Sequence, residues 1–143
     1  KDGTLRTLPG QKVQVLCRME NDIMDVVDAC IDGTLDKVDL KFEDNAAVCV
    51  VLASDGYPVS YEKGFPITGL ENFKGKDDYY CFHAGTKFDA EGRVVTNGGR
   101  VLGITAKGKD LKEARKKAYE ATEWVSFENK YMRHDIGKAI DEA

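Results

Sequence analysis

The stretch Ala46-Ala47-Val48-Cys49-Val50-Val51-Leu52-Ala53 is the longest uninterrupted apolar run in this sequence. Its length suits one strand, and a continuous apolar run is typical of a strand that is covered on both faces. A membrane-spanning helix needs roughly 18 or more apolar residues. We therefore predict that residues 46–53 form a central strand of a sheet, and we expect neither a spanning segment nor a membrane partner.

Other segments on both sides of this run also have strand patterns. Alternating apolar and charged residues predict a half-exposed strand at 38–42, and Gly92 occupies the position of a hairpin turn that takes a positive φ. The predicted strands and hairpin are residues 13–17, 38–42, 78–83, 88–95 and 100–106. Between them, residues 54–69 form a long loop with little periodic pattern, and such loops are typically functional or mobile.

A first helix is predicted to begin at Asn21 or Asp22 and to end at Gly33. Its apolar residues recur every three or four positions, at Ile23, Val26, Val27, Cys30 and Ile31. The other face is acidic, through Asp25, Asp28 and Asp32. We interpret this acidic face as solvated, since a cation would need a second element to complete its oxygen ligands.

A second helix is predicted after Asp110, which has the spacing of a capping box with Glu113. A narrow stripe of mostly small residues follows, at Leu111, Ala114, Ala118, Ala121 and Val125. Basic residues on the outer side, at Lys112, Arg115 and Lys116, are interpreted as a solvated face. Together these elements predict one α+β domain with a largely antiparallel sheet and flanking helices.

The charge of the chain argues against a nucleic-acid partner. Its 143 residues carry a formal net charge of −4, whereas nucleic-acid-binding domains are usually strongly basic. Residues 1–78 contain 9 basic and 15 acidic side chains, and residues 79–143 contain 12 basic and 10 acidic ones. An anionic small molecule is therefore expected to meet the second half of the chain.

Cysteine and histidine usage predicts no zinc site. The positions of the two histidines, His83 and His134, do not match the spacing of zinc ligands, and the cysteines form no C-x-x-C pair. We expect reduced, structural thiols and a cytoplasmic protein. The four cysteines are Cys17, Cys30, Cys49 and Cys81.

Two short stretches combine small residues with polar groups: His83-Ala84-Gly85-Thr86 and Thr96-Asn97-Gly98-Gly99-Arg100. Paired glycines allow main-chain N–H groups to approach an anion, and Arg100 can offer a carboxylate or phosphate two parallel hydrogen bonds. The alternative is a glycine-rich bend in which Arg100 pairs with a surface acid. His83 suits either a structural hydrogen bond or proton transfer. No nucleophile elbow, Walker loop or dinucleotide motif is present.

Several blocks in one order resemble the carboxy-terminal part of the phosphoribosylamine–glycine ligase family, also called glycinamide ribonucleotide synthetase. They include Phe82-His83-Ala84-Gly85-Thr86 and Thr96-Asn97-Gly98-Gly99-Arg100-Val101-Leu102-Gly103. The full set is residues 19–23, 32–35, 50–58, 63–70, 82–86, 94–103 and 133–137.

The resemblance implies an ATP-grasp ligase of purine biosynthesis, which converts ATP, 5-phosphoribosylamine and glycine to ADP, phosphate and glycinamide ribonucleotide. It implies that ATP and magnesium or manganese are bound by upstream ATP-grasp domains of the same polypeptide, so we expect neither on this fragment. Residues 1–18 depart from the family pattern, and residues 19–143 are assigned to the C-terminal domain. We expect the fragment alone to be inactive.

The resemblance also suggests a substrate-binding role for seven residues and no catalytic or metal-binding ones. Arg100 would neutralise a phosphate or carboxylate, the amides of Gly98 and Gly99 would cradle it, and Thr86 or His83 would orient it. The set is His83, Gly85, Thr86, Asn97, Gly98, Gly99 and Arg100.

Other interpretations stay open at this point. Arg133 and Asp135 are read as a salt bridge between the last segment and the body of the domain. The alternatives to a ligase fragment are a free-standing module that binds a phosphorylated metabolite and a small hydrolase that uses His83.

Overall fold

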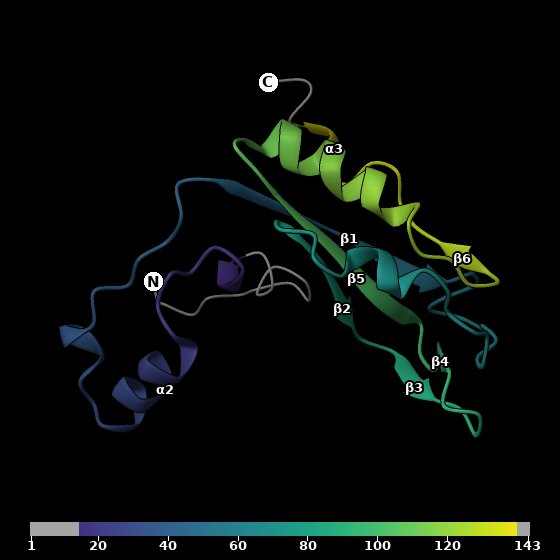
Figure 1. Cartoon of the computed structure of the whole chain (residues 1–143), viewed down its shortest axis with the longest axis horizontal. Coiled ribbons are helices and arrows are strands. Elements are labelled where there is room, and N and C mark those ends of the chain that lie inside the picture. The colour runs from purple at the N-terminus through teal and green to yellow at the C-terminus, as the bar shows by residue number, and fades with distance from the viewer. Residues whose placement is uncertain (1–14, 140–143) are drawn as a thin grey trace.

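The computed structural model describes residues 15–139, in which a four-stranded antiparallel sheet carries α3 on one face (Figure 1). The strands lie in the order β2-β5-β1-β6. The two long central strands confirm the predicted strands at 46–53 and 100–106. The bounds are Ala46–Ser54 for β1, Tyr79–His83 for β2, Arg100–Gly108 for β5, Lys130–Tyr131 for β6 and Leu111–Thr122 for α3.

The register of β1 against β5 determines which residues stand at each end of the sheet. Ala46 lies opposite Gly108 and Leu52 opposite Leu102, but the register then shifts so that Ala53 lies opposite Arg100. Such a bulge bends the strand and increases its local twist. β2 ends at the same place, because His83 pairs with Leu102.

The core lies between the sheet and α3, and small residues allow the two to approach closely. Ala114, Ala118 and Ala121 have no exposed surface, which confirms most of the predicted stripe. Leu111 differs, because it is 47% exposed in the first turn of the helix. The predicted cap is confirmed at Asp110, whose Oδ1 accepts a hydrogen bond from Glu113 N at 2.8 Å. Glu113 itself accepts from Lys109 N at 2.9 Å, one residue before the expected partner.

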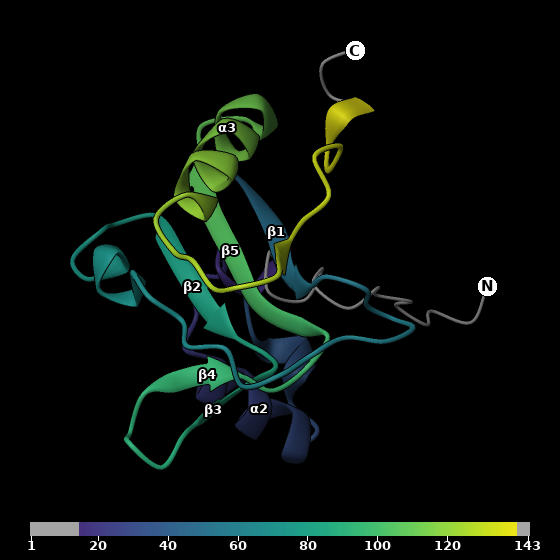
Figure 2. The same ribbon diagram turned by 90° about the vertical axis from the view of Figure 1, so that its right-hand side faces the viewer.

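β1 is fully buried on only one of its two faces. Residues 46, 48, 50, 52 and 54 are buried, whereas the alternating residues between them are half-buried. The prediction of a strand covered on both faces is therefore fulfilled only on the face that α3 covers. Figures 1 and 2 show α3 on that side of the sheet and α2 on the other.

The hairpin of β3 (Thr86–Phe88) and β4 (Val94–Thr96) confirms the prediction for residues 88–95, and Gly92 has a φ of 79°. The long loop before it is held in place. Pro66 and Thr68 form bridges to Val95 and Ser126, and the 3₁₀ helix η2 (Leu70–Phe73) follows the loop. The peptide bond between Tyr57 and Pro58 in this loop is cis.

The predicted first helix is confirmed as α2 (Ile23–Ile31), with Asp22 Oδ1 accepting from Met24 N at 2.8 Å. The strand predicted at 38–42 is wrong. The 3₁₀ helix η1 (Leu35–Lys37) precedes it, and only Phe42 forms a bridge, to Met19. An alternating pattern makes a strand only where a neighbouring strand supplies hydrogen bonds along its length.

The strand predicted at 13–17 is also wrong in its described part. Val15 and Leu16 are helical, and residues 13 and 14 lie outside the described range. Of the helices in residues 15–139, none has the length and apolar content to cross a membrane. The observed architecture is α+β, as predicted.

Candidate functional site

The two glycine-containing stretches meet at the end of the sheet where β2 stops and β5 begins. Gly85 N donates to Arg100 O at 2.8 Å, and Asn97 N donates to Gly85 O at 2.7 Å. All seven residues that the sequence predicts to bind substrate therefore lie at one edge. We call residues 83–86 with residues 97–100, which are these seven and Ala84, the glycine edge.

The glycines of this edge allow close contacts between its main-chain segments and with the Tyr57 ring. A Cβ on Gly85 would stand 2.5 Å from Arg100 O and 2.7 Å from the Cα of Gly98, and a Cβ on Gly99 would overlap the Tyr57 ring. None of the three has a positive φ. Close packing therefore accounts for the glycines, as the alternative interpretation of a glycine-rich bend expects.

Ser54 and Tyr57 support the glycine edge, and the sequence reading did not assign them to it. Ser54 is fully buried, and its N and Oγ donate to Gly99 O at 2.8 Å and to Gly98 O at 3.0 Å. The signal was available, because residues 50–58 were among the family-like blocks. The sequence pattern there predicts only a strand and a turn.

The polar side chains of the edge face outward. His83, Asn97 and Arg100 are exposed, and Thr86 is half-buried. His83 Nδ1 lies 3.0 Å from Thr86 Oγ1, which fixes the imidazole relative to the hydroxyl. Arg100 forms no ion pair with a carboxylate of residues 15–139. The edge thus has an exposed guanidinium, an exposed amide and an exposed imidazole, which are groups that can donate hydrogen bonds to an anion.

A second cluster of charges, centred on Lys107, joins the start of β1 to β5. Lys107 Nζ lies 2.8 Å from a Glu43 carboxylate oxygen and 3.5 Å from Asp78. Burial opposes the charge on Lys107, but the hydrogen bond and attraction of Glu43 and Tyr80 raise its pKa overall. The hydrogen bond from Lys107 lowers the pKa of Glu43. These partners are satisfied within the cluster, so its role is structural.

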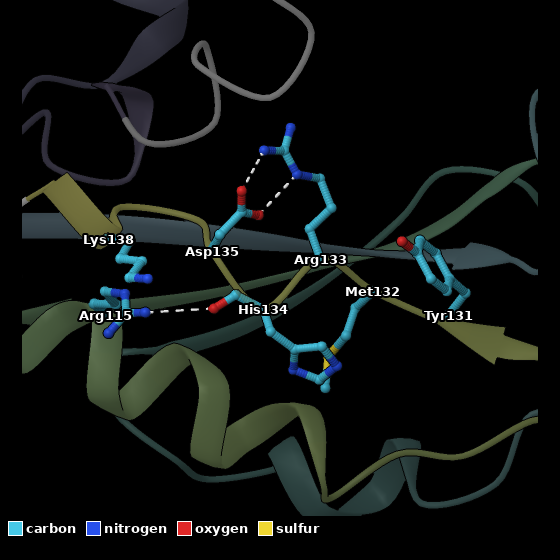
Figure 3. Close-up of a pocket in the computed structure, with 7 residues that line it drawn as sticks. All are labelled: Arg115, Tyr131, Met132, Arg133, His134, Asp135 and Lys138. Carbon is cyan, nitrogen blue, oxygen red and sulfur yellow. Dashed lines mark hydrogen bonds and ion pairs between the residues drawn. The ribbon is translucent and has the colours of Figure 1, made fainter.

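A groove of about 560 Å³ lies between α3 and residues 131–138 (Figure 3). The docking contacts come from α3. Arg115 Nε donates to Ile136 O at 2.7 Å, and the Tyr119 hydroxyl donates to Arg133 O at 2.8 Å. Arg115 is thus a docking residue, which corrects the prediction of a solvated one.

The predicted bridge between the tail and the body through Arg133 and Asp135 is wrong. The two side chains point toward each other, with Arg133 Nη2 2.6 Å from Asp135 Oδ2, so the pair closes within the tail (Figure 3). Two residues this close in sequence pair locally at lower entropic cost than across the fold.

Within residues 15–139, no group of three His, Cys, Asp or Glu side chains is placed to hold a metal ion. The described residues therefore do not fit a magnesium or manganese site, and no step of the chemistry is assigned to such an ion on this chain.

Known proteins resemble this chain in both sequence and structure. Residues 47–139 match the family described as phosphoribosylglycinamide synthetase, C domain. A chloroplastic phosphoribosylamine–glycine ligase of Arabidopsis thaliana is 48% identical over 86% of this chain and 23% of its own length. The phosphoribosylamine–glycine ligase of Caldanaerobacter subterraneus is 46% identical over 85% of this chain and 28% of its own length.

The crystal structure of phosphoribosylamine–glycine ligase from Thermotoga maritima matches this chain with a TM-score of 0.60 and 41% sequence identity. The match covers 77% of this chain and 27% of the Thermotoga chain. This chain therefore spans about a quarter of the length of these relatives. The match to the family model covers most of the residues around the sheet and α3, so the chain belongs to the phosphoribosylglycinamide synthetase family, of which it contains the C domain.

Proposed function

We propose that this chain acts as the C-terminal domain of a phosphoribosylamine–glycine ligase, in which the glycine edge forms the substrate-side wall of the active site. The reaction joins the amine of 5-phosphoribosylamine to the carboxylate of glycine while ATP is hydrolysed to ADP and phosphate. ATP and its magnesium or manganese ion would be held by the ligase domains upstream, and the proposed location is the cytoplasm. This chain alone would then be inactive.

The observation that carries the proposal is that Arg100 is exposed and, within the part of the chain that the structure describes, unpaired on a fixed main chain. Its side chain is exposed, no carboxylate of the described residues pairs with it, and its main chain is fixed by Gly85. A guanidinium on a rigid edge can bind a phosphate or carboxylate in two parallel hydrogen bonds. Both substrates carry such a group, since 5-phosphoribosylamine has a phosphate and glycine has a carboxylate.

The imidazole of His83 and the amide of Asn97 would orient the bound group rather than transfer a proton. His83 Nδ1 is already engaged with Thr86 Oγ1 at 3.0 Å. An edge of this kind contributes by positioning, which can account for a large part of a ligase's rate enhancement.

A chimera tests the proposal. The C-terminal part of the Caldanaerobacter ligase that matches this chain is replaced by this chain, and ADP formation that depends on both glycine and 5-phosphoribosylamine is measured. Arg100→Met is expected to lower kcat/KM about 100-fold or more, which corresponds to roughly 3 kcal/mol of lost charge-assisted binding. Arg100→Lys should recover part of the loss, because the charge returns without the bidentate geometry.

Arg93→Met is the matched control, because Arg93 lies on the neighbouring hairpin and already pairs with Asp89 at 2.8 Å. It should leave kcat/KM unchanged. Equal kinetics for the Arg100 and Arg93 variants would exclude a substrate-binding role for Arg100. Tight binding of ribose 5-phosphate to this chain alone, measured by calorimetry, would instead favour the free-standing module.

A further inference from the structure

The apolar stripe of α2 lacks a partner within the described chain. Ile23, Val27 and Ile31 recur every four residues, and they are 45%, 40% and 76% exposed. Ala29 is the only buried residue of the helix. Among the helices and strands of residues 15–139, α2 makes its largest contact with η1, and that contact is small. Helices in globular proteins gain most of their stability by packing such a stripe.

Apolar side chains are exposed throughout the described segment before β1, not only in α2. Of the sixteen buried hydrophobic residues that the structure describes, only Ala29 lies in residues 15–42, whereas nine of the fifteen exposed large hydrophobic residues lie there. Scattered exposed apolar residues are normal, but a concentration of this kind marks an interaction surface. The nine are Val15, Leu16, Ile23, Met24, Val27, Ile31, Leu35, Leu40 and Phe42.

The family match separates α2 from the C domain. That match begins at residue 47, at the start of β1. The Arabidopsis ligase nevertheless matches over 124 residues, whereas only 97 residues of this chain lie at or after position 47. More than twenty of the matched residues therefore precede β1, so the relatives share the α2 region although it lies outside their C domain.

We infer that α2 is part of the hydrophobic core of the ligase domain that precedes the C domain, and that its stripe of Ile23, Val27 and Ile31 docks on apolar surface of that domain. The inference rests on the proposed function. It places the boundary of the C domain at residues 43–46, whereas the sequence alone predicts a boundary between residues 18 and 19. α2 then anchors the C domain to the upstream part of the enzyme.

Charge favours the upstream domain over a second copy of this chain. Residues 21–33 contain four aspartates, Asp22, Asp25, Asp28 and Asp32, and no basic residue. Two copies that met through α2 would place these carboxylates close together, which disfavours the contact. A different domain can offer a neutral or basic rim around its apolar surface.

The half-buried face of the sheet, opposite α3, lies on the same side of the molecule as α2 (Figures 1 and 2). α2 lies on the side of the sheet away from α3 (Figures 1 and 2). On that side β1 presents the half-buried alternate residues of an apolar run, and Phe82 of β2 is 37% exposed. A domain packed on α2 would approach this face as well.

The test compares this chain alone with the chimera described above, in which the upstream ligase domains are present. Hydrogen exchange of the α2 amides is expected to be at least tenfold slower in the chimera than in the isolated chain. Val27→Ser is compared with Asp28→Ser, which introduces the same residue at the next position. In the chimera, Val27→Ser should lower Tm by several degrees and Asp28→Ser should not. In the isolated chain neither should change Tm.

Equal exchange of α2 in the two proteins overturns the inference, as does equal destabilisation of both by Val27→Ser. A chimera that fails to fold also counts against it, because the segment would then not fit its partner. A dimer of the isolated chain that Val27→Ser disperses would assign the stripe to a second copy. If Val27→Ser alone prevents folding of the chimera, the inference is judged by hydrogen exchange of α2 in the chimera and the isolated chain without substitutions.

Activity separates this inference from the proposed function. An active chimera whose α2 exchanges freely contradicts only the inference. An inactive chimera whose α2 is protected supports the inference and contradicts the proposed function.

Discussion

Gly85 and Gly98 lie in close main-chain contact, and this contact leaves no room for a side chain on Gly85. A Cβ on Gly85 would be 2.7 Å from the Cα of Gly98, and one on Gly98 would be 3.0 Å from the Cα of Gly85. This contact joins the end of β2 to the turn before β5, and it fixes the position from which Arg100 projects. The stability of the glycine edge and the placement of its guanidinium therefore depend on the same atoms.

Gly85→Ala is expected to destabilise the chain by about 2–3 kcal/mol, because an added methyl group in a packed interior forces the backbone to shift. Gly92→Ala is the matched control. It meets no atom within 4 Å but has a φ of 79°, so only backbone strain opposes it. That change should cost about 1 kcal/mol. Urea unfolding measures both, and similar losses for the two variants would refute the close-packing explanation.

Loss of the cap of α3 should weaken the helix that covers the sheet. Asp110→Ala removes the oxygen that accepts from Glu113 N at 2.8 Å, and we expect a loss of about 1 kcal/mol in the free energy of unfolding. Lys112→Ala, on the exposed side of the same turn, should change it by less than about 0.5 kcal/mol. Thermal unfolding distinguishes the two, and a neutral Asp110→Ala would show that the cap is not needed.

Acid should weaken the chain partly through Glu43. The pKa of this group is lowered from its usual 4.5, chiefly by the hydrogen bond from Lys107, and a lowered folded-state pKa stabilises the folded form above the unfolded-state value. This stabilisation is lost as the pH falls through the folded-state pKa. The free energy of unfolding should therefore fall less between pH 6 and pH 3 in Glu43→Gln than in the wild type.

Glu62→Gln serves as the control for this pH experiment, since Glu62 is exposed and has no ion pair within residues 15–139. Its profile should follow the wild type. The other carboxylates with lowered pKa values, Asp89, Glu113 and Asp135, are present in all three proteins, so their contributions cancel in the comparison. Parallel curves for Glu43→Gln and the wild type would contradict the expectation.

The docking of the tail, residues 131–138, on α3 should depend on Tyr119 and not on the ion pair of Arg133 with Asp135. The Tyr119 hydroxyl donates to Arg133 O at 2.8 Å and accepts from Ile136 N at 3.0 Å. Tyr119→Phe removes both hydrogen bonds, at a cost of about 1–2 kcal/mol. It should also speed hydrogen exchange in residues 131–138.

Arg133→Gln breaks only an exposed pair within the tail, for which we expect a change of about 0.5 kcal/mol or less. If Arg133→Gln loosened the tail as much as Tyr119→Phe, docking through α3 would be the wrong account of this segment.

The sequence alone was sufficient to predict elements that depend on interactions between residues near one another in the chain. The continuous apolar run of β1, the three-and-four spacing of α2 and α3, and the caps at Asp22 and Asp110 each depend on residues near one another in the chain. The strand, both helices and the cap at Asp110 appear in the structure as predicted, although β1 is fully buried on one face only. The block order likewise sufficed for the family, because several motifs in one sequence constrain it more than any single motif does.

Tertiary structure decided what depends on residues far apart. Residues 38–42 have a strand pattern but lack a neighbouring strand to pair with. The stripe of α2 predicts a packed helix, yet it faces outward because the surface that it needs is not among residues 15–139. The reason for the paired glycines also came only from the fold, since a sequence shows that a side chain is missing but not which atoms occupy its place. Burial and contact are properties of the whole arrangement, so local composition can predict an element but not what it meets.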